Sequence, residues 1–381
     1  MSVPNKSVLT EQIRTEAERL GFFKVGVTRA RPLPSEERLE RWLADGMQGA
    51  MGYMERQAER RKDPRRVMEN ARSLVVAAMN YDSGDSLRDD PLRGRISRYA
   101  WGDDYHGVVR ARLEELYRFI RLQAPGASGL CYVDTGPIME KVWGAESALG
   151  WIGKHTNLIT REQGSWFFIG VILLDLELEY DAAERDYCGT CARCIAACPT
   201  GAIVAPYVLD ARLCISYLTI ELRGPIPRAL RPLVGNRIYG CDDCQEVCPW
   251  NRFAVSSTEP AFQPRPGNWM PELAPLVDLG PDEFNRRFAS SAVRRAGRDG
   301  FVRNVVVALG NSRSSEAVPP LARALTDPSA LVRGHASWAL GEIDCPEARA
   351  LLEAARARET DLEVLDEIDA ALAHSQEAPE P

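Results

Sequence analysis

Apolar residues recur with two different spacings along the first 180 residues, and the two spacings predict helices interleaved with strands. Residues 7–20 repeat apolar side chains at helical intervals, and Gly21 ends the segment. Further helices are expected at 35–45, 55–66, 106–123 and before Leu149. The helix at 35–45 is expected to be capped by Ser35 and to bury Trp42 and Leu43. Short apolar runs predict strands at 22–28, 73–81, 130–133 and 166–174.

The end of the chain has a different pattern, in which two similar helical segments follow each other. Residues 302–310 and 332–341 both begin with Val-Arg and end with Ala-Leu-Gly, about 31 residues apart. This period is typical of helix-pair repeats of the HEAT type, which usually form binding surfaces. Residues 253–281 carry six prolines and predict an irregular linker. We therefore expect four parts: 1–180, 181–252, 253–281 and 282–375.

Eight of the ten cysteines lie in the second of these parts, at ordered intervals. The first run is Cys188, Cys191, Cys194 and Cys198, followed by Pro199. The second is Cys241, Cys244 and Cys248, followed by Pro249, with Cys214 upstream. Two-residue gaps let one loop present three thiolates to one cubane, and the last cysteine of each run passes to the other cluster. We expect one 4Fe–4S cluster on Cys188, Cys191, Cys194 and Cys248, and a second on Cys198, Cys214, Cys241 and Cys244.

Zinc sites and disulfides are the alternatives for these cysteines. Zinc sites usually combine Cys-x2-Cys pairs over longer intervals and lack the Cys-Pro ending. Disulfides need an oxidising compartment, and the N-terminal residues contain no apolar signal segment. The iron–sulfur interpretation is therefore favoured. The other two cysteines, Cys131 and Cys345, are expected to be structural.

Charge is unevenly distributed along the chain, although its formal net value is only −7. Acidic residues are concentrated after Glu342, whereas residues 222–240 and 285–303 are rich in arginine. Such segments can form a phosphate-binding face, or simply a solvated surface. No apolar run approaches the ~20 residues of a membrane span. With oxygen-sensitive clusters and no export signal, we expect a cytoplasmic protein that does not bind membranes.

Two clusters transfer single electrons, and the preceding 180 residues are long enough to hold the group that receives them. Flavin, corrinoid and haem are the candidates. Haem is disfavoured because the chain has four histidines and no Cys-x2-Cys-His motif. A cobalamin would bind base-off without a histidine ligand, since no Asp-x-His-x2-Gly motif is present. The residue types and spacing alone leave flavin and corrinoid open.

Several motifs together resemble the epoxyqueuosine reductase family over nearly the whole chain. They are the two cysteine runs, Val133-Asp134-Thr135-Gly136-Pro137, residues 150–157 (GWIGKHTN), Arg98-Tyr99-Ala100 with Asp104-Tyr105-His106, residues 214–221 (CISYLTIE) and residues 240–250 (GCDDCQEVCPW). The resemblance implies an α+β chain with three functional parts. These are an N-terminal α/β cobalamin-binding domain like that of reductive dehalogenases, a bacterial-type ferredoxin module and C-terminal HEAT-like repeats.

The resemblance also implies an activity, the reduction of epoxyqueuosine to queuosine at the wobble position of tRNA. An external low-potential donor would supply electrons through both clusters to cobalamin, forming cob(I)alamin. Asp134 would be the proton donor, and a corrin face above it should raise its pKa. From the residues alone, Asp134 could instead cap a helix beginning at Gly136.

The family further suggests which side chains contact the cofactor and the substrate. Expected cobalamin contacts are Gln57, Ser97, Asp134, Asn157, Leu158, Ile169 and Ser216. Lys141, Lys154 and His155 could bind corrin propionamides or tRNA phosphates. Tyr105 and His106 are expected at the substrate face, although His106 could be only a residue of a helix N-terminus. Arginines expected to contact tRNA phosphates are Arg223, Arg228, Arg231, Arg237, Arg294, Arg295, Arg298 and Arg303.

Two other functions share part of this evidence. A corrinoid reductive dehalogenase would use the same clusters and cofactor, but such enzymes usually carry a twin-arginine export signal and have no use for the repeats. An electron-transfer or cobalamin-handling protein would have no substrate of its own. We expect a monomeric enzyme that acts on the anticodon stem-loop of tRNA.

Overall fold

The computed structural model describes residues 5–85 and 89–374. Contacts divide the chain into two units that are each assembled from separate segments. Of the described residues, the first unit contains 5–85, 102–212 and 243–263. The second contains 89–101, 213–242 and 264–374. The four parts expected from the sequence follow the continuity of the chain. The compact units do not, because the cysteine-rich part contributes residues to both.

A four-stranded sheet in the order β1-β2-β7-β4 forms the centre of the first unit, and all its neighbouring strands are antiparallel. The strands of this unit are β1 (Lys24–Arg29), β2 (Ser73–Asn80), β4 (Gly129–Tyr132), β5 (Trp151–Ile152), β6 (Leu158–Ile159), β7 (Phe167–Leu174), β8 (Ile203–Ala205) and β9 (Val208–Leu209). Its helices are α1 (Lys6–Arg19), α2 (Glu36–Ala44), α3 (Gly52–Arg56), α4 (Ala58–Lys62), α5 (Tyr105–Gln123), α6 (Glu140–Glu146), α7 (Arg193–Ala197) and α10 (Asp243–Glu246).

Helices cover both faces of this sheet, which explains the continuous apolar runs of its central strands. On β7, Val171 belongs to the core that contains Trp143 of α6. The neighbouring Gly170 faces Leu113 of α5, and a Cβ on Gly170 would lie 2.5 Å from that side chain. Because successive residues of a strand point to opposite faces, α5 and α6 lie on opposite sides of the sheet. The α+β class expected from the sequence is confirmed.

Three local predictions for this unit differ from the structure. The helix expected at 55–66 is broken at Gln57, which ends α3 and precedes α4. Ser35 stands at the N-cap of α2 but accepts no capping hydrogen bond. Trp42 and Leu43 are half-buried, and Leu39 is the buried residue of α2.

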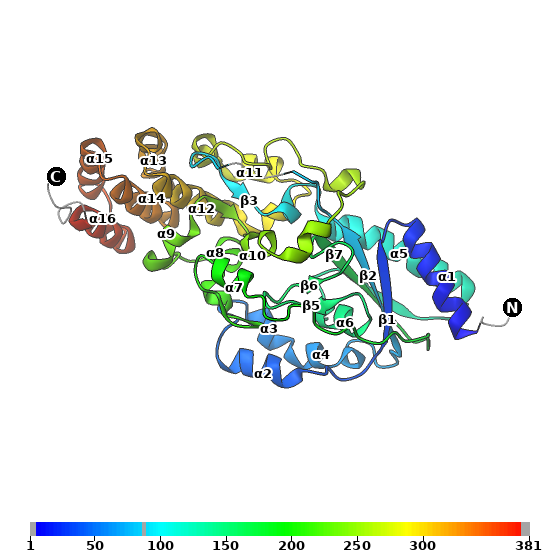
Figure 1. Ribbon diagram of the computed structural model, residues 1–381. Coiled ribbons are helices and arrows are strands. Elements are labelled where there is room, and N and C mark those ends of the chain that lie inside the picture. Colours follow the sequence, from blue (N-terminus) through cyan, green and yellow to red (C-terminus); the bar gives the residue numbers. More distant parts are fainter. Residues whose placement is uncertain (1–4, 86–88, 375–381) are drawn as a thin grey trace. The chain divides into compact units, whose positions relative to one another are not determined.

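Packed helices dominate the second unit. Its elements are β3 (Arg95–Ile96), β10 (Arg237–Tyr239), α8 (Ile215–Ile220), α9 (Arg231–Val234), α11 (Pro281–Arg287), α12 (Gly297–Ser312), α13 (Val318–Ala324), α14 (Ala330–Ile343), α15 (Pro346–Arg356) and α16 (Leu362–His374). Helix α14 packs against α12 and α16 (Figure 1). On α12, Gly310 allows this approach, since a Cβ there would lie 2.7 Å from the Cα of Ala339. The two segments predicted to repeat correspond to α12 and α14.

The linker predicted at 253–281 contains only short 3-10 turns, as its proline content suggests. None of the helices in the described part of the chain is long and apolar enough to cross a membrane.

Candidate functional site

Asp134 occupies a strained turn directly after strand β4. Its φ angle is +58°, in the left-handed region that non-glycine residues adopt rarely. The backbone N–H of Thr135 donates to the carbonyl of Val133 at 2.6 Å, so the chain reverses around Asp134. Helix α6 begins later, with Met139 at its N-cap, and this excludes the alternative that Asp134 caps a helix at Gly136. The turn leaves the Asp134 side chain 66% exposed.

The start of α5 brings Tyr105 and His106 to this carboxylate. The Tyr105 hydroxyl donates to Oδ2 of Asp134 at 2.5 Å, and Nε2 of His106 lies 3.7 Å from the same oxygen. The Tyr105 ring stacks on His106 and on Phe168 of β7, with centroid distances of 4.0 and 4.3 Å. Asp104 caps α5 and also contacts Nδ1 of His106 at 2.6 Å. His106 is therefore both a helix N-terminal residue and a neighbour of Asp134.

Electrostatics assign the proton of this pair to the histidine. Burial lowers the pKa of His106, but Asp104 and Asp134 outweigh it and raise the pKa to about 9. Desolvation by the surrounding protein raises the pKa of the partly exposed Asp134, but His106 and Tyr105 outweigh this effect, and the pKa lies below its ordinary value. The raised pKa expected for Asp134 depended on a corrin face above it, and the polypeptide without a cofactor shifts the pKa in the opposite direction. In this state Asp134 is a carboxylate beside an imidazolium.

Glu140, the first residue of α6, is a second carboxyl group near Asp134. Burial and then the negative charge of Asp134 raise the pKa of Glu140 to about 8. Its Oε1 atom is buried and has no hydrogen-bond partner among the described residues. Sequence analysis missed this residue. The only available signal was its position six residues after Asp134, at the start of a predicted helix.

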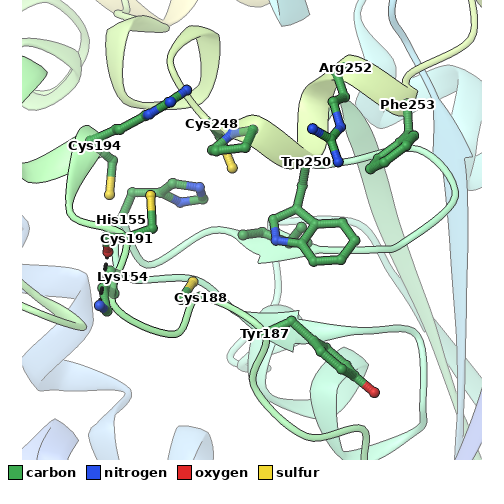
Figure 2. A pocket seen from close by; sticks show the side chains of 13 residues that line it. Lys154, His155, Tyr187, Cys188, Cys191, Cys194, Cys248, Trp250, Arg252 and Phe253 are labelled. Carbon is green, nitrogen blue, oxygen red and sulfur yellow. Dashed lines mark hydrogen bonds between the residues drawn. The ribbon is translucent and has the colours of Figure 1, made fainter.

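A cavity of about 220 Å³ in the same unit is lined by four of the cysteines. Cys188, Cys191 and Cys194 lie around α7, and Cys248 approaches from the segment after α10 (Figure 2). Burial raises the pKa of the Cys188, Cys194 and Cys248 thiols. Trp250 and Tyr187 complete an aromatic wall, with Trp151 in edge contact with both rings. The sequence signal for Trp250 was its position directly after Cys248-Pro249.

These four thiols are the set predicted for the first cluster. None of the ten cysteines, all in the described part of the chain, forms a disulfide. No group of three His, Cys, Asp or Glu side chains among the described residues is placed to hold a metal ion. The fit of a cluster therefore rests on the shared cavity, the chemistry of its four sulfur donors and the spacing of the cysteines.

Lys154 and His155, which were expected to bind a propionamide or a phosphate, lie at this cavity. The Lys154 ammonium donates to the carbonyls of Gly189 and Cys191, at 2.7 and 2.8 Å, and so holds the cysteine loop. His155 lines the cavity and is 3% exposed. Burial, and then the positive charge of Lys141, lower the pKa of His155 to about 4, so the ring is neutral near pH 7. Lys141 donates to Oδ1 of Asn157 at 2.7 Å.

The cysteines predicted for the second cluster belong to both units. Cys198 ends α7, and its sulfur accepts from the backbone N–H of Ala202 at 3.2 Å. Cys244 lies in α10 of the same unit. In the second unit, Cys214 precedes α8 and Cys241 follows β10. Of the two cysteines outside the motif, Cys131 lies on β4, where burial raises its pKa to about 12, and Cys345 caps α15.

The predicted cobalamin contacts are also distributed over both units. In the first, Gln57 lies between α3 and α4, Asn157 and Leu158 lie at β6, and Ile169 lies on β7. In the second, Ser97 is buried and donates to Asp242 at 2.5 Å, and Ser216 lies on α8.

Several predicted phosphate ligands are engaged in internal contacts of the second unit. Arg231 is 1% exposed and pairs with Glu367 at 2.7 Å, and Arg303 is fully buried and donates to the carbonyls of Leu218, Leu222 and Gly224. These two are corrected to structural residues, because their donors are used inside the fold. Three more form ion pairs: Arg298 with Asp327, Arg228 with Asp366 and Glu367, and Arg295 with Glu221. Two donate to backbone carbonyls: Arg223 to those of Arg295 and Ala296, and Arg237 to that of Val234. Arg294 is exposed and forms no ion pair with described residues.

Three family models match separate parts of the chain. Residues 61–135 match the epoxyqueuosine reductase QueG domain (DUF1730). Residues 187–251 match a 4Fe-4S double cluster binding domain, and this range includes all eight cysteines of the two predicted clusters. Residues 291–373 match HEAT repeats, which confirms the repeats predicted from the sequence.

Two epoxyqueuosine reductases match most of the chain. An epoxyqueuosine reductase of Xanthomonas campestris is 42% identical over 346 residues, covering 89% of this chain and 97% of that protein. The corresponding protein of Escherichia coli is 40% identical over 338 residues, covering 88% of this chain and 89% of that protein.

Solved structures agree with this relationship. One is a crystal structure of epoxyqueuosine reductase with a tRNA-Tyr epoxyqueuosine-modified stem loop. It superposes with a TM-score of 0.92 at 32% identity, covering 98% of this chain and all of that one. Another, from Bacillus subtilis, has its aspartate-bearing catalytic loop swung out of the active site. It has a TM-score of 0.90 at 31% identity, covering 97% of this chain and all of that one. The chain belongs to the epoxyqueuosine reductase family, whose members are oxidoreductases.

Proposed function

We propose that this protein reduces epoxyqueuosine in tRNA to queuosine, with Asp134 as the proton donor. Conversion of an epoxide to an alkene consumes two electrons and two protons and releases the oxygen as water. The site must therefore deliver protons to that oxygen while electrons arrive from another side. The observation that supports the assignment most strongly is Asp134 itself, an exposed carboxylate in a strained turn beside Tyr105 and His106.

The pair formed by His106 and Asp134 can store one of the two protons that this reaction needs. At neutral pH the proton resides on His106, because its pKa is about 9, and Asp134 is the more exposed of the two. A substrate that covers Asp134 removes water from the ion pair and favours the neutral forms of both groups. The proton then lies on the Asp134 carboxyl, from which it passes to the epoxide oxygen. Tyr105 keeps the carboxylate oriented through its 2.5 Å hydrogen bond.

The iron–sulfur clusters are proposed on the two sets of cysteines predicted from the sequence. For the first, Cys188, Cys191, Cys194 and Cys248 line one cavity, and the chemistry of this donor set fits a 4Fe–4S cluster. For the second, Cys198, Cys214, Cys241 and Cys244 all lie in the range of the double-cluster family model. Such clusters supply electrons one at a time. An external low-potential donor is needed to reduce them.

Cobalamin is the proposed electron acceptor, and in reduced form it would supply both electrons to the substrate. The residues of the first unit suit such a group. Gln57 and Asn157 offer neutral amides that match its propionamide rim, and the half-buried Ile169 offers an apolar surface. Two described histidines are engaged elsewhere, His106 with two carboxylates and His155 at the cysteine cavity. This is consistent with base-off binding without a histidine ligand.

The proposed partner is the anticodon stem-loop, whose modified base must leave its stack to reach Asp134. Arg294 is the phosphate contact that the structure favours among the predicted arginines, because its guanidinium is exposed and has no acidic partner among described residues. Arg223, Arg228 and Arg295 are exposed but already bonded, and using them would require exchange of an internal contact.

The test is turnover of tRNA that carries epoxyqueuosine, with the reconstituted protein, cobalamin and a strong reductant. We expect queuosine to accumulate in the nucleoside digest as epoxyqueuosine disappears. Conversion should require both the iron–sulfur clusters and cobalamin. Protein with full iron and bound cobalamin that leaves the epoxide unchanged would overturn the proposal. Conversion of an aryl halide without conversion of tRNA would favour a dehalogenase.

A further inference from the structure

His155 presents an unused hydrogen-bond donor to the cysteine cavity. The residue lies in the loop between β5 and β6, and its imidazole points into the space surrounded by Cys191, Cys194 and Cys248 (Figure 2). The ring is 3% exposed, and its Nε2 atom has no hydrogen-bond partner among the described residues. Leaving a buried polar atom without a hydrogen bond is unfavourable, because the atom has lost its contact with water. Such an atom needs a partner that arrives with a bound group.

The loop fixes which nitrogen of His155 carries the proton. The backbone N–H of Asn157 donates to Nδ1 at 3.1 Å, so Nδ1 is the acceptor and Nε2 of the neutral ring bears the hydrogen. Gly153 holds the ring in place on another side. A Cβ at Gly153 would lie 3.1 Å from Cε1 and 3.3 Å from Nε2 of His155, closer than side chains normally pack. The donor is therefore oriented before any group binds.

We propose that the Nε2–H of His155 donates a hydrogen bond to a sulfur atom of the cluster held by Cys188, Cys191, Cys194 and Cys248, and thereby raises its reduction potential. The inference rests on the proposed cluster at that cavity. Reduction adds negative charge that spreads over the sulfur atoms, and a hydrogen-bond donor stabilises the reduced form more than the oxidised one. Protein polar groups around a cluster set its potential in this way.

The sequence neighbours of His155 connect it to the cysteine loop and to a proposed cobalamin contact. Lys154 binds the carbonyls of Gly189 and Cys191, so the residue before His155 holds the loop that carries cluster ligands. Asn157, which anchors Nδ1 of His155, also receives a hydrogen bond from Lys141 and is a proposed cobalamin contact. One short loop thus links the cysteine cavity to the proposed electron acceptor. Through its direct hydrogen bond, His155 adjusts how readily this cluster accepts an electron.

The experiment compares His155→Leu, which removes the donor, with His155→Gln, which keeps an amide N–H. Phe253→Leu is the matched control, because Phe253 lines the same cavity without a polar atom. Each full-length protein is reconstituted with iron and sulfide, assayed for iron, and titrated with reductant while its EPR signal is followed. Pulsed EPR of the reduced protein then tests for a weak nitrogen coupling to the cluster.

We expect all four proteins to hold equal iron, and one of the two cluster potentials to become more negative in His155→Leu. His155→Gln should restore part of that shift, Phe253→Leu should match the wild type, and the nitrogen coupling should vanish in His155→Leu. Unchanged potentials in a fully loaded His155→Leu protein would overturn the inference and leave the proposed clusters intact. Loss of iron in both His155 variants would also overturn it, assigning His155 to cluster retention. Failure of the wild type to bind iron would refute the proposed cluster itself.

Discussion

Two regions of the molecule were predicted to be functional. One is the cysteine cavity and the Asp134 turn of the first unit, and the other is the pair of arginine-rich segments of the second unit. They differ in how their polar groups are used. Near the cavity and the turn, Nε2 of His155 and Oε1 of Glu140 have no hydrogen-bond partner in the described part of the chain, and Asp134 is held at a φ of +58°. In the arginine segments, Arg231 and Arg303 have their donors bonded inside the fold. The difference between these two regions is therefore whether the polar groups remain available to a bound molecule, which residue type alone does not tell.

The acidic end of the chain pairs with two of the predicted arginines. Asp366 and Glu367 of α16 pair with Arg228 and Arg231, and Glu359 pairs with Arg333. The two signs of charge are separated along the sequence but adjacent within this unit. A charge count by segment therefore overestimates the cationic surface available to phosphate.

Replacing Asp134 is expected to have the largest effect on activity. Asparagine tolerates the left-handed backbone, so Asp134→Asn should keep the turn while removing the proton donor. We expect turnover of epoxyqueuosine tRNA to fall by about 10²–10⁴-fold, the usual contribution of general acid catalysis. Iron content and the free energy of unfolding should change little. Glu114→Gln, an exposed carboxylate of α5, is the control and should keep normal turnover. Near-normal turnover of Asp134→Asn would refute the role of Asp134 as proton donor.

Replacing Arg231 should show the opposite profile, with a large effect on stability. Arg231 and Glu367 form an ion pair whose side chains are 2% and 15% exposed. Removing one member of a buried pair typically costs about 3–5 kcal/mol, because the other charge is left without its partner. Arg231→Leu should therefore lower the free energy of unfolding in urea by about that amount. Adding Glu367→Leu should recover part of the loss.

Arg228 provides the matched comparison, since it binds the same Glu367 but is 43% exposed. Arg228→Ala should cost less than ~1 kcal/mol, as exposed ion pairs do. Equal losses for Arg228→Ala and Arg231→Leu would contradict the view that burial makes Arg231 structural.

The spacing of the cysteines predicts the cluster ligands, because such ligands are carried by short loops, and Cys188, Cys191 and Cys194 lie within seven residues of one another. The role of Asp134 was predicted through the family resemblance, since the residues alone left a helix cap open. The direction of the His155 ring, the burial of Glu140 and the pairing of Arg231 with Glu367 depend on packing between distant segments. The last pair is separated by 136 residues. No local spacing could have revealed these contacts.

Glu140, which lies near Asp134, should make the free energy of unfolding depend on pH. Its pKa is raised from 4.5 to about 8, so the folded state holds a proton that the unfolded state loses. This contribution to stability is complete below pH 4.5 and declines as the pH rises toward 8. Glu140→Gln should remove that part of the decline in urea unfolding measured between pH 5 and 8. Asp134→Asn should reduce the decline too, because the charge of Asp134 raises the pKa of both Glu140 and His106. Identical slopes in the wild type and Glu140→Gln would show that Glu140 is ionised throughout.

Arg294 is the exception among the arginines, and its replacement should have the smallest effect. It is exposed on the turn before α12 and has no acidic partner among described residues. Arg294→Ala should change the free energy of unfolding by less than ~0.5 kcal/mol. If the side chain contacts a phosphate, the variant should bind tRNA more weakly, and the slope of log affinity against log salt should shrink by about 1. Arg118→Ala, an arginine of α5 that is 72% exposed, is the control for loss of one positive charge. An equal change in slope for both variants would mean that Arg294 contributes only through the overall charge of the protein. No change in slope for Arg294→Ala would mean that Arg294 is a solvated surface residue without a phosphate contact.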